Sequence, residues 1–120
     1  MKVAISSQGN HLDAAVDPRF GRAASFILID PETEAFEVIE NKQNLNLPQG
    51  AGIQAGKTIV DHDAAAVITG NCGPKAFNVL SAAGVKLYVG AKGTVREAFE
   101  RYKNGELQAA SNPNVEGHWV

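Results

Sequence analysis

The alternation of strand-like and helix-like segments in the second half of the chain most constrains its possible folds. A buried run at residues 64–70 passes through glycines into a helix predicted at 73–84. The same pattern repeats at residues 85–105, where Thr94 and Glu97 form a capping box at the predicted helix start. Parallel strands need helical crossovers that cover both faces of their sheet. The pattern therefore predicts an α/β fold.

The first half of the chain has a rhythm that is typical of antiparallel strands. Short apolar runs at residues 2–6 and 25–30 predict two strands, and an Asp-Pro turn separates the second from the alternating segment 35–41. The last two segments therefore predict a hairpin, which makes the sheet mixed. Residues 42–49 predict a polar loop, and the apolar spacing over residues 52–61 predicts the first helix.

The composition limits the class of protein. The 120 residues, 44% hydrophobic and 20% charged, are those of one ordinary globular domain, which we expect to span residues 1–120 with a loop-like tail from about residue 108. The N-terminal segment has no apolar run as long as a signal peptide or a membrane span, so we expect a cytoplasmic protein with no membrane partner. The net charge of -2 argues against a nucleic-acid partner.

The connection between the first two predicted strands concentrates side chains that could bind a ligand. The candidates are His11, Arg19, Phe20, Gly21 and Arg22. Such a loop presents cationic donors at one end of the sheet, and its glycine lets a ligand approach the backbone. The alternative is a surface loop satisfied internally, in which Asp17 and Arg19 pair with the backbone or each other and Phe20 anchors the loop to the core. The residues alone leave both interpretations open.

A second group of candidates joins the predicted strand at residues 64–70 to the following helix. Its members are Gly70, Asn71, Cys72, Gly73, Pro74 and Lys75. They occupy the carboxyl end of a parallel strand, where ligands usually bind in α/β folds. Cys72 is the only cysteine of the chain, so it forms no internal disulfide and no thiolate cluster. A helix start could stabilise its thiolate, whereas the frequent burial of cysteine favours a small apolar role.

Three other features point away from enzymatic chemistry. The glycine-rich residues 50–56 lack the spacing of a phosphate-binding loop, which favours close packing of a helix against the sheet. Asp61, His62 and Asp63 are neighbours that would point to different faces of a helix, so a histidine at a helix end is favoured over a metal site. The chain has neither a nucleophile elbow nor a zinc-protease motif. We therefore predict that the protein is not an enzyme.

In order and spacing, several segments resemble the dinitrogenase iron-molybdenum cofactor biosynthesis family. They are MKVAIS, LDAAVDPRFGRAASFILID, the GAG helix start, AAVITGNCGPKAFNVLSAAGVKLYVG and GTVREAFERYKNGEL, and they cover Met1 to about Leu107. The resemblance implies a ribonuclease H-like three-layer α/β/α fold with a five-stranded mixed sheet in the order 3-2-1-4-5. It implies no nuclease activity, because the first strand, KVAIS, lacks the aspartate of a two-metal site.

The resemblance also implies non-enzymatic binding or carrying of a molybdenum-containing sulfide cluster. The cargo would be a molybdenum-copper sulfide cluster, or a related molybdenum or iron sulfide cluster, held without covalent attachment. Such a cluster is an anion with its own sulfide ligands, so the protein must supply donors and positive charge, and no direct protein ligand to the metal is predicted. We expect the donors to be the backbone near Gly73 and the side chains of Arg19, Arg22, His11 and Lys75. Phe20 and Pro74 would shield the sulfide surface.

The expected partners are the metal-sulfide cluster and a protein that donates or accepts it. An alternative function uses the same two loops. In this alternative the domain is a regulatory or interaction module that recognises a partner protein or a nucleotide anion.

Overall fold

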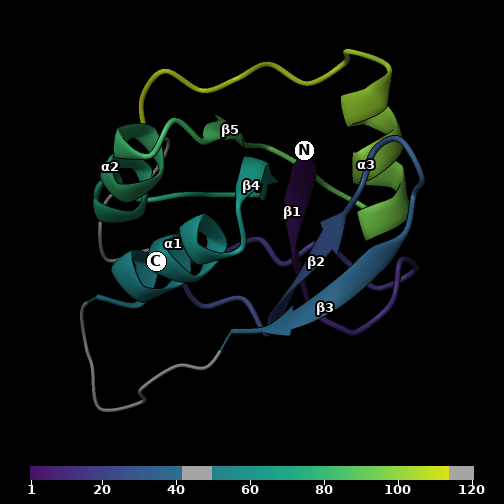
Figure 1. The fold of residues 1–120 in the computed structure, drawn as a ribbon, viewed down its shortest axis with the longest axis horizontal. Coiled ribbons are helices and arrows are strands. Elements are labelled where there is room, and N and C mark those ends of the chain that lie inside the picture. Colours follow the sequence, from purple (N-terminus) through teal and green to yellow (C-terminus); the bar gives the residue numbers. More distant parts are fainter. Residues whose placement is uncertain (42–49, 114–120) are drawn as a thin grey trace.

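The computed structural model describes residues 1–41 and 50–113. Five strands of this part of the chain form one sheet, in the order β3-β2-β1-β4-β5 (Figure 1). The strands are β1 (Lys2–Ser7), β2 (Ser25–Ile29), β3 (Phe36–Glu40), β4 (Ala64–Ile68) and β5 (Lys86–Tyr88). β2 pairs antiparallel with both β1 and β3, whereas β4 runs parallel to both β1 and β5. The predicted mixed sheet and its strand order are confirmed.

Helices cover both faces of this sheet (Figure 1). They are α1 (Ala51–Asp61), α2 (Pro74–Ala82) and α3 (Val95–Lys103). Ile59 of α1 and Leu80 of α2 belong to one hydrophobic cluster, and Val95 and Phe99 of α3 belong to another. α1 and α2 therefore lie on one face and α3 on the opposite face, which gives the expected α/β/α layers.

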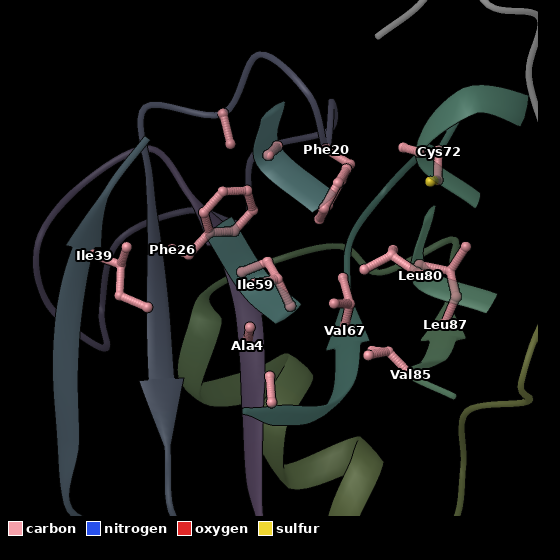
Figure 2. Packing of buried hydrophobic residues seen from close by; sticks show 14 of the residues in the cluster. Ala4, Phe20, Phe26, Ile39, Ile59, Val67, Cys72, Leu80, Val85 and Leu87 are labelled. Atoms are coloured by element: carbon pink, nitrogen blue, oxygen red, sulfur yellow. The ribbon is translucent and has the colours of Figure 1, made fainter. Parts of the chain in front are cut away.

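Successive side chains of each inner strand point into different layers. In β1, Ala4 belongs to the cluster under α1 and α2, whereas Val3 and Ile5 belong to the cluster under α3. β2 alternates in the same way, because Phe26 joins the first cluster and Ile27 the second. Figure 2 shows the first cluster, with Phe26 and Ala4 directed toward the helices that cover it. Burial on both faces explains why the inner strands read as nearly continuous apolar runs.

The helix ends follow the predicted local signals. The Thr94 side chain accepts a hydrogen bond from the Glu97 amide at 3.1 Å, and the Glu97 carboxylate accepts one from the Thr94 amide at 2.9 Å, so the capping box is confirmed. α3 ends before Gly105, which has a positive φ of 73°. α1 begins at Ala51, one residue before the predicted start, because Gly50 adopts the left-handed conformation that opens the helix. His62 caps the end of α1, as expected.

The predicted hairpin is formed by β2 and β3. Its turn is organised by the Asp30 carboxylate, which accepts hydrogen bonds from the Glu32 amide at 2.8 Å and the Thr33 amide at 3.4 Å. These hydrogen bonds hold the pKa of Asp30 below its usual value, the Glu32 amide contributing most. β3 is the outer strand, and Ile39 is its buried residue.

The chain after α3 returns to the opposite edge of the sheet. The Ala110 amide donates a hydrogen bond to the Leu87 carbonyl at 2.7 Å, and Ala109 bridges to Tyr88, so this segment lies along β5. Residues 108–113 of the predicted tail form neither a helix nor a strand, while residues 114–120 and the polar loop predicted at 42–49 lie outside the described residues. Within the described ranges, no helix has the length and apolar character needed to cross a membrane.

Candidate functional site

The two predicted groups of site residues follow β1 and β4. Because these strands are parallel, their carboxyl ends lie at the same end of the sheet, where residues 8–24 and residues 69–73 form the connections (Figure 1). In α/β folds, ligands usually bind at this end of the strands.

Direct hydrogen bonds join the two connections. The Phe20 amide donates to the Asn71 carbonyl at 3.1 Å, and the Asn71 side-chain amide donates to the Pro18 carbonyl at 2.9 Å. Gly70 lies so close to Pro18 that a Cβ atom at position 70 would be 2.7 Å from the Pro18 Cα atom. We call this contact, between residues 18–20 and residues 70–71, the loop junction. It requires glycine at position 70 because a side chain there would force the loops apart.

The segment 17–24, here called the arginine loop, is closed by a buried carboxylate. Asp17 accepts hydrogen bonds from the Arg19 amide at 3.0 Å and from the Ala24 amide at 3.3 Å, through different carboxylate oxygens. Asp17 is only 5% exposed to solvent. The interpretation in which Asp17 pairs with the backbone is therefore confirmed, and this pairing sets the shape of the loop.

A buried hydroxyl pair attaches the same loop to the two parallel strands. Ser6 lies 2.8 Å from the Asp17 carbonyl and 2.7 Å from the Thr69 hydroxyl, both measured from its Oγ atom. Ser6 can donate to the carbonyl while it accepts from Thr69, so both hydroxyl groups are satisfied. The ends of β1 and β4 are thus tied to the start of the arginine loop.

Asn41 attaches the other end of the arginine loop to the hairpin. Its side-chain amide donates to the Gly21 carbonyl at 3.1 Å and to the Ala23 carbonyl at 2.9 Å. The residue is 8% exposed and follows β3 directly. Sequence reasoning missed Asn41, because an asparagine after a strand indicates only a turn. Its buried partners are twenty and eighteen positions away in the sequence.

The Phe20 and Cys72 side chains are both fully buried in the cluster under α1 and α2. Figure 2 shows them at the same end of this cluster. The Phe20 ring lies 5.2 Å from the Phe26 ring between centroids, which confirms that Phe20 anchors the loop to the core. Burial also raises the pKa of Cys72 to about 12, so its thiol stays protonated at neutral pH. The apolar interpretation of Cys72 is therefore favoured.

The remaining residues of the two groups differ in exposure. Arg19 and Lys75 are exposed, Arg22, Asn71 and Pro74 are half-buried, and Gly21, Gly70 and Gly73 are buried. Gly73 is the N-cap of α2, whose first residue is Pro74. The positive end of the helix dipole and three cationic side chains therefore occur in segments that meet at or adjoin the loop junction. This combination of charges suits an anion.

The structure places His11 in a different half of the connection between β1 and β2. The Leu12 carbonyl accepts a hydrogen bond from the Arg96 amide at 2.9 Å, and the Ala14 carbonyl accepts one from the Val95 amide at 2.9 Å. His11 is exposed in this half, which pairs with the start of α3 rather than with residues 70–71. Its predicted place beside the arginines thus finds no support in these contacts.

The glycine-rich residues 50–56 serve helix packing. A Cβ atom at Gly56 would lie 2.9 Å from Cγ1 of Val79, so α1 approaches α2 closely at this point. Packing rather than phosphate binding was expected, but the close partner is the neighbouring helix instead of the sheet. Among the described residues, no group of three or more His, Cys, Asp or Glu side chains is arranged to hold a metal ion.

Comparison with known protein families gives a match over most of the chain. The dinitrogenase iron-molybdenum cofactor family matches residues 1–105, which include both connections of the site. The chain belongs to this family. An uncharacterised protein of Methanocaldococcus jannaschii is 29% identical to this chain over 111 residues, which are 90% of each chain.

Solved structures of similar proteins cover nearly the whole domain. The apo form of the orange protein from Desulfovibrio gigas is 41% identical, with a TM-score of 0.92 over 95% of this chain and 96% of its own. A putative NifB protein from Thermotoga is 35% identical, with a TM-score of 0.79 over 97% and 98% of the two chains. A putative dinitrogenase from M. jannaschii is 27% identical, with a TM-score of 0.70 over 94% and 97%.

Proposed function

We propose that this family member binds and carries a molybdenum-containing sulfide cluster, and that it does not catalyse a reaction. The proposed cargo is a molybdenum-copper sulfide cluster or a related molybdenum or iron sulfide cluster. The proposed site is the surface around the loop junction, between Arg19 and Arg22 on one side and the start of α2 on the other. The proposal includes the ribonuclease H-like classification of the three-layer fold.

The observation that carries this proposal is the loop junction itself. Hydrogen bonds of 3.1 and 2.9 Å hold the arginine loop against residues 70–71, which precede α2. The backbone segments that carry Arg19, Arg22 and the start of α2 are therefore joined before any ligand arrives. Such preorganised donors favour an anion because little conformational entropy is lost on binding.

The state of Cys72 determines which kind of attachment we propose. A buried thiol with a raised pKa is a poor metal ligand, because the thiolate is the form that binds metal. A sulfide cluster brings its own sulfur ligands, so it needs charge-assisted hydrogen bonds from the protein instead. The family membership and the likeness to the orange protein agree with a metal-cluster cargo.

Reconstitution of the purified protein tests this function. The protein is incubated with tetrathiomolybdate and copper, passed through gel filtration, and examined by visible absorption and elemental analysis. We expect a coloured species that elutes with the folded domain and contains molybdenum in a fixed ratio to protein. The matched control is the same chain in denaturant, which keeps Cys72 and all three histidines but lacks the loop junction.

Two results would count against the carrier function. One is the absence of any stable coloured species with the folded protein. The other is equal retention of metal by the unfolded chain, which would indicate unspecific binding to side chains. If saturable binding of a nucleotide were found in place of the cluster, the domain would be a regulatory module instead.

A further inference from the structure

The outer edge of β3 has backbone groups that no strand of the sheet uses. β3 pairs with β2 alone, and the Asn41 amide donates to the Ala24 carbonyl while the Asp30 amide donates to the Ala35 carbonyl. Hydrogen-bonded pairs alternate along an antiparallel ladder, so this phase also turns the backbones of Glu37 and Ile39 toward β2.

The intervening residues of β3 therefore turn their N–H and C=O groups away from the sheet. These residues are Phe36, Val38 and Glu40, and we call them, with Glu37 and Ile39, the β3 edge. Three outward residues on one short strand offer the hydrogen-bonding pattern that a further strand needs. The described residues contain no strand that uses them.

Two of these outward residues also carry exposed apolar side chains. Phe36 is 43% exposed and Val38 is 37% exposed; together with Met1 they are the large hydrophobic residues left exposed in the described ranges. Their partners in β2 are Ile29 and Ile27, which belong to the cluster under α3. Phe36 and Val38 thus extend this apolar face of the sheet beyond the part that α3 buries.

The charged residues of the segment around the β3 edge are all acidic. Residues 30–40 contain five acidic side chains and no basic one. Lysines from outside this segment meet two of them: Lys103 lies 2.6 Å from Glu34, and Lys2 lies 4.0 Å from Glu37. The N-terminal ammonium is also close enough to lower the pKa of Asp30. Five acids against these three cations leave a local excess of two negative charges. An incoming strand with basic side chains would be attracted, and one with acidic side chains would be repelled.

The β3 edge also leads to the candidate functional site. The strand ends at Glu40, and the next residue, Asn41, donates its two hydrogen bonds to the carbonyl groups of Gly21 and Ala23. A chain that pairs with β3 would therefore end beside the arginine loop.

We propose that the β3 edge binds an extended segment of a partner protein in which basic side chains alternate with apolar ones. The segment adds a strand to the sheet, its backbone pairing with Phe36, Val38 and Glu40 and its apolar side chains covering Phe36 and Val38. A second copy of this chain is a poor occupant, because two acidic hairpins would be brought together. Docking at the β3 edge does not depend on the cluster, but a cluster donor or acceptor is suitably placed there.

A synthetic peptide of alternating lysine and valine, seven residues long and blocked at both ends, is the probe for this edge. Titration into isotope-labelled protein should shift the amide signals of Phe36, Val38 and Glu40 most, and should slow their hydrogen exchange. A peptide with glutamate in place of lysine should bind at least about tenfold more weakly, because the excess negative charge of residues 30–40 repels it instead of attracting it.

Val38→Pro is the sharpest variant for the same test. Proline removes the outward N–H of residue 38 without removing a bond to β2, so the folded sheet should tolerate it at this edge. We expect about tenfold weaker peptide binding, from the lost hydrogen bond and the steric effect of the ring. Val38→Thr is the matched control, because it keeps the N–H and the β-branched shape and should bind much as the original does.

Several outcomes would overturn the proposal. They are no amide shift at millimolar peptide, equal shifts with the glutamate peptide, or unchanged binding by a folded Val38→Pro variant. Dimers in sedimentation experiments that disappear in Val38→Pro would assign the β3 edge to a second copy instead. All these measurements use protein without a cluster, so their failure is distinct from failure of the carrier function.

Discussion

The Asn71 side chain donates a hydrogen bond to the Pro18 carbonyl, across 2.9 Å and 53 positions of the sequence. Together with the Phe20 amide, which donates to the Asn71 carbonyl, it holds the connection after β1 against the connection after β4. The loop junction is therefore part of the folded domain itself. Arg19 lies within this junction, and Arg22 follows it in the same loop.

Loss of both arginines should abolish cluster retention. Each charge-assisted contact contributes about 1.5 to 3 kcal/mol, or roughly ten- to a hundredfold in affinity, so Arg19→Ala with Arg22→Ala should lose the cluster during gel filtration. The matched control is Lys86→Ala with Arg101→Ala, which removes two exposed cations from β5 and α3. Full cluster retention by this control, which has the same net charge as the Arg19→Ala, Arg22→Ala variant, would show that the position of the two arginines matters. Equal losses from both double variants would contradict the proposed site.

Cys72→Ser should leave cluster retention nearly intact. The thiol is fully buried and its pKa is raised to about 12, so we expect it to contribute apolar packing rather than a bond to metal. Absorption and the molybdenum-to-protein ratio after reconstitution measure the outcome. A folded but colourless Cys72→Ser protein, alongside a fully reconstituted double arginine variant, would instead demonstrate a thiolate bond to the cluster.

The same cysteine should affect stability at alkaline pH. Burial raises its pKa from 9.0 to about 12, so the unfolded chain releases this proton at a lower pH than the folded protein. The stabilising contribution is complete below pH 9 and is lost as the pH rises through the interval up to about 12. Relative to Cys72→Ser, the original protein should lose about 2 to 3 kcal/mol of unfolding free energy between pH 9 and 11. Urea unfolding of both proteins measures this difference, and parallel pH profiles would refute it.

Gly70→Ala should separate the two connections. The new Cβ atom would lie 2.7 Å from the Pro18 Cα atom, so backbone must move. We expect a stability loss of about 1 to 3 kcal/mol and weak cluster retention. Gly56→Ala is the control, because it creates a 2.9 Å contact with Val79 between α1 and α2. It should lower stability while the cluster is retained. If both folded variants retained the cluster equally, the loop junction would not be needed.

Asn41→Asp should loosen the arginine loop with little change in size. At neutral pH the carboxylate cannot donate to the Gly21 and Ala23 carbonyls, so these two hydrogen bonds are lost. We expect a cost of about 1 to 3 kcal/mol and faster hydrogen exchange in residues 20–23. Acidification should restore part of the stability difference, because a protonated carboxyl can donate one bond. Asn78→Asp, on the exposed surface of α2, is the charge-matched control and should leave this exchange unchanged.

Local sequence signals predicted the elements well because they act over a few residues. Thr94 and Glu97 are three positions apart, and their capping box forms as expected. The Asp-Pro turn and the alternating segment after it likewise predicted the β2–β3 hairpin. The predicted start of α1 was one residue too late, because the left-handed conformation of Gly50 lets the helix begin at Ala51.

The roles of single site residues were harder to predict because they depend on distant partners. The sequence allowed Phe20 and Cys72 either a ligand-binding role or a buried apolar one, and only the packing of distant segments shows that both side chains lie in the core. Asn41 gave no signal at all, since the carbonyl groups it binds belong to a different loop.

The amino-acid sequence by itself determined which segments form strands and helices, and the order of the resulting sheet agreed with the family resemblance. It also placed both arginines in the connection between the first two strands, and the Gly70–Lys75 segment at the carboxyl end of a parallel strand. Only the tertiary structure decided that Asn71 bonds to Pro18, that Cys72 is buried, and that the neighbours of His11, Leu12 and Ala14, bond to the start of α3. Periodicity and capping arise between neighbours in the chain, whereas burial and long-range hydrogen bonds arise only when separate segments are packed together.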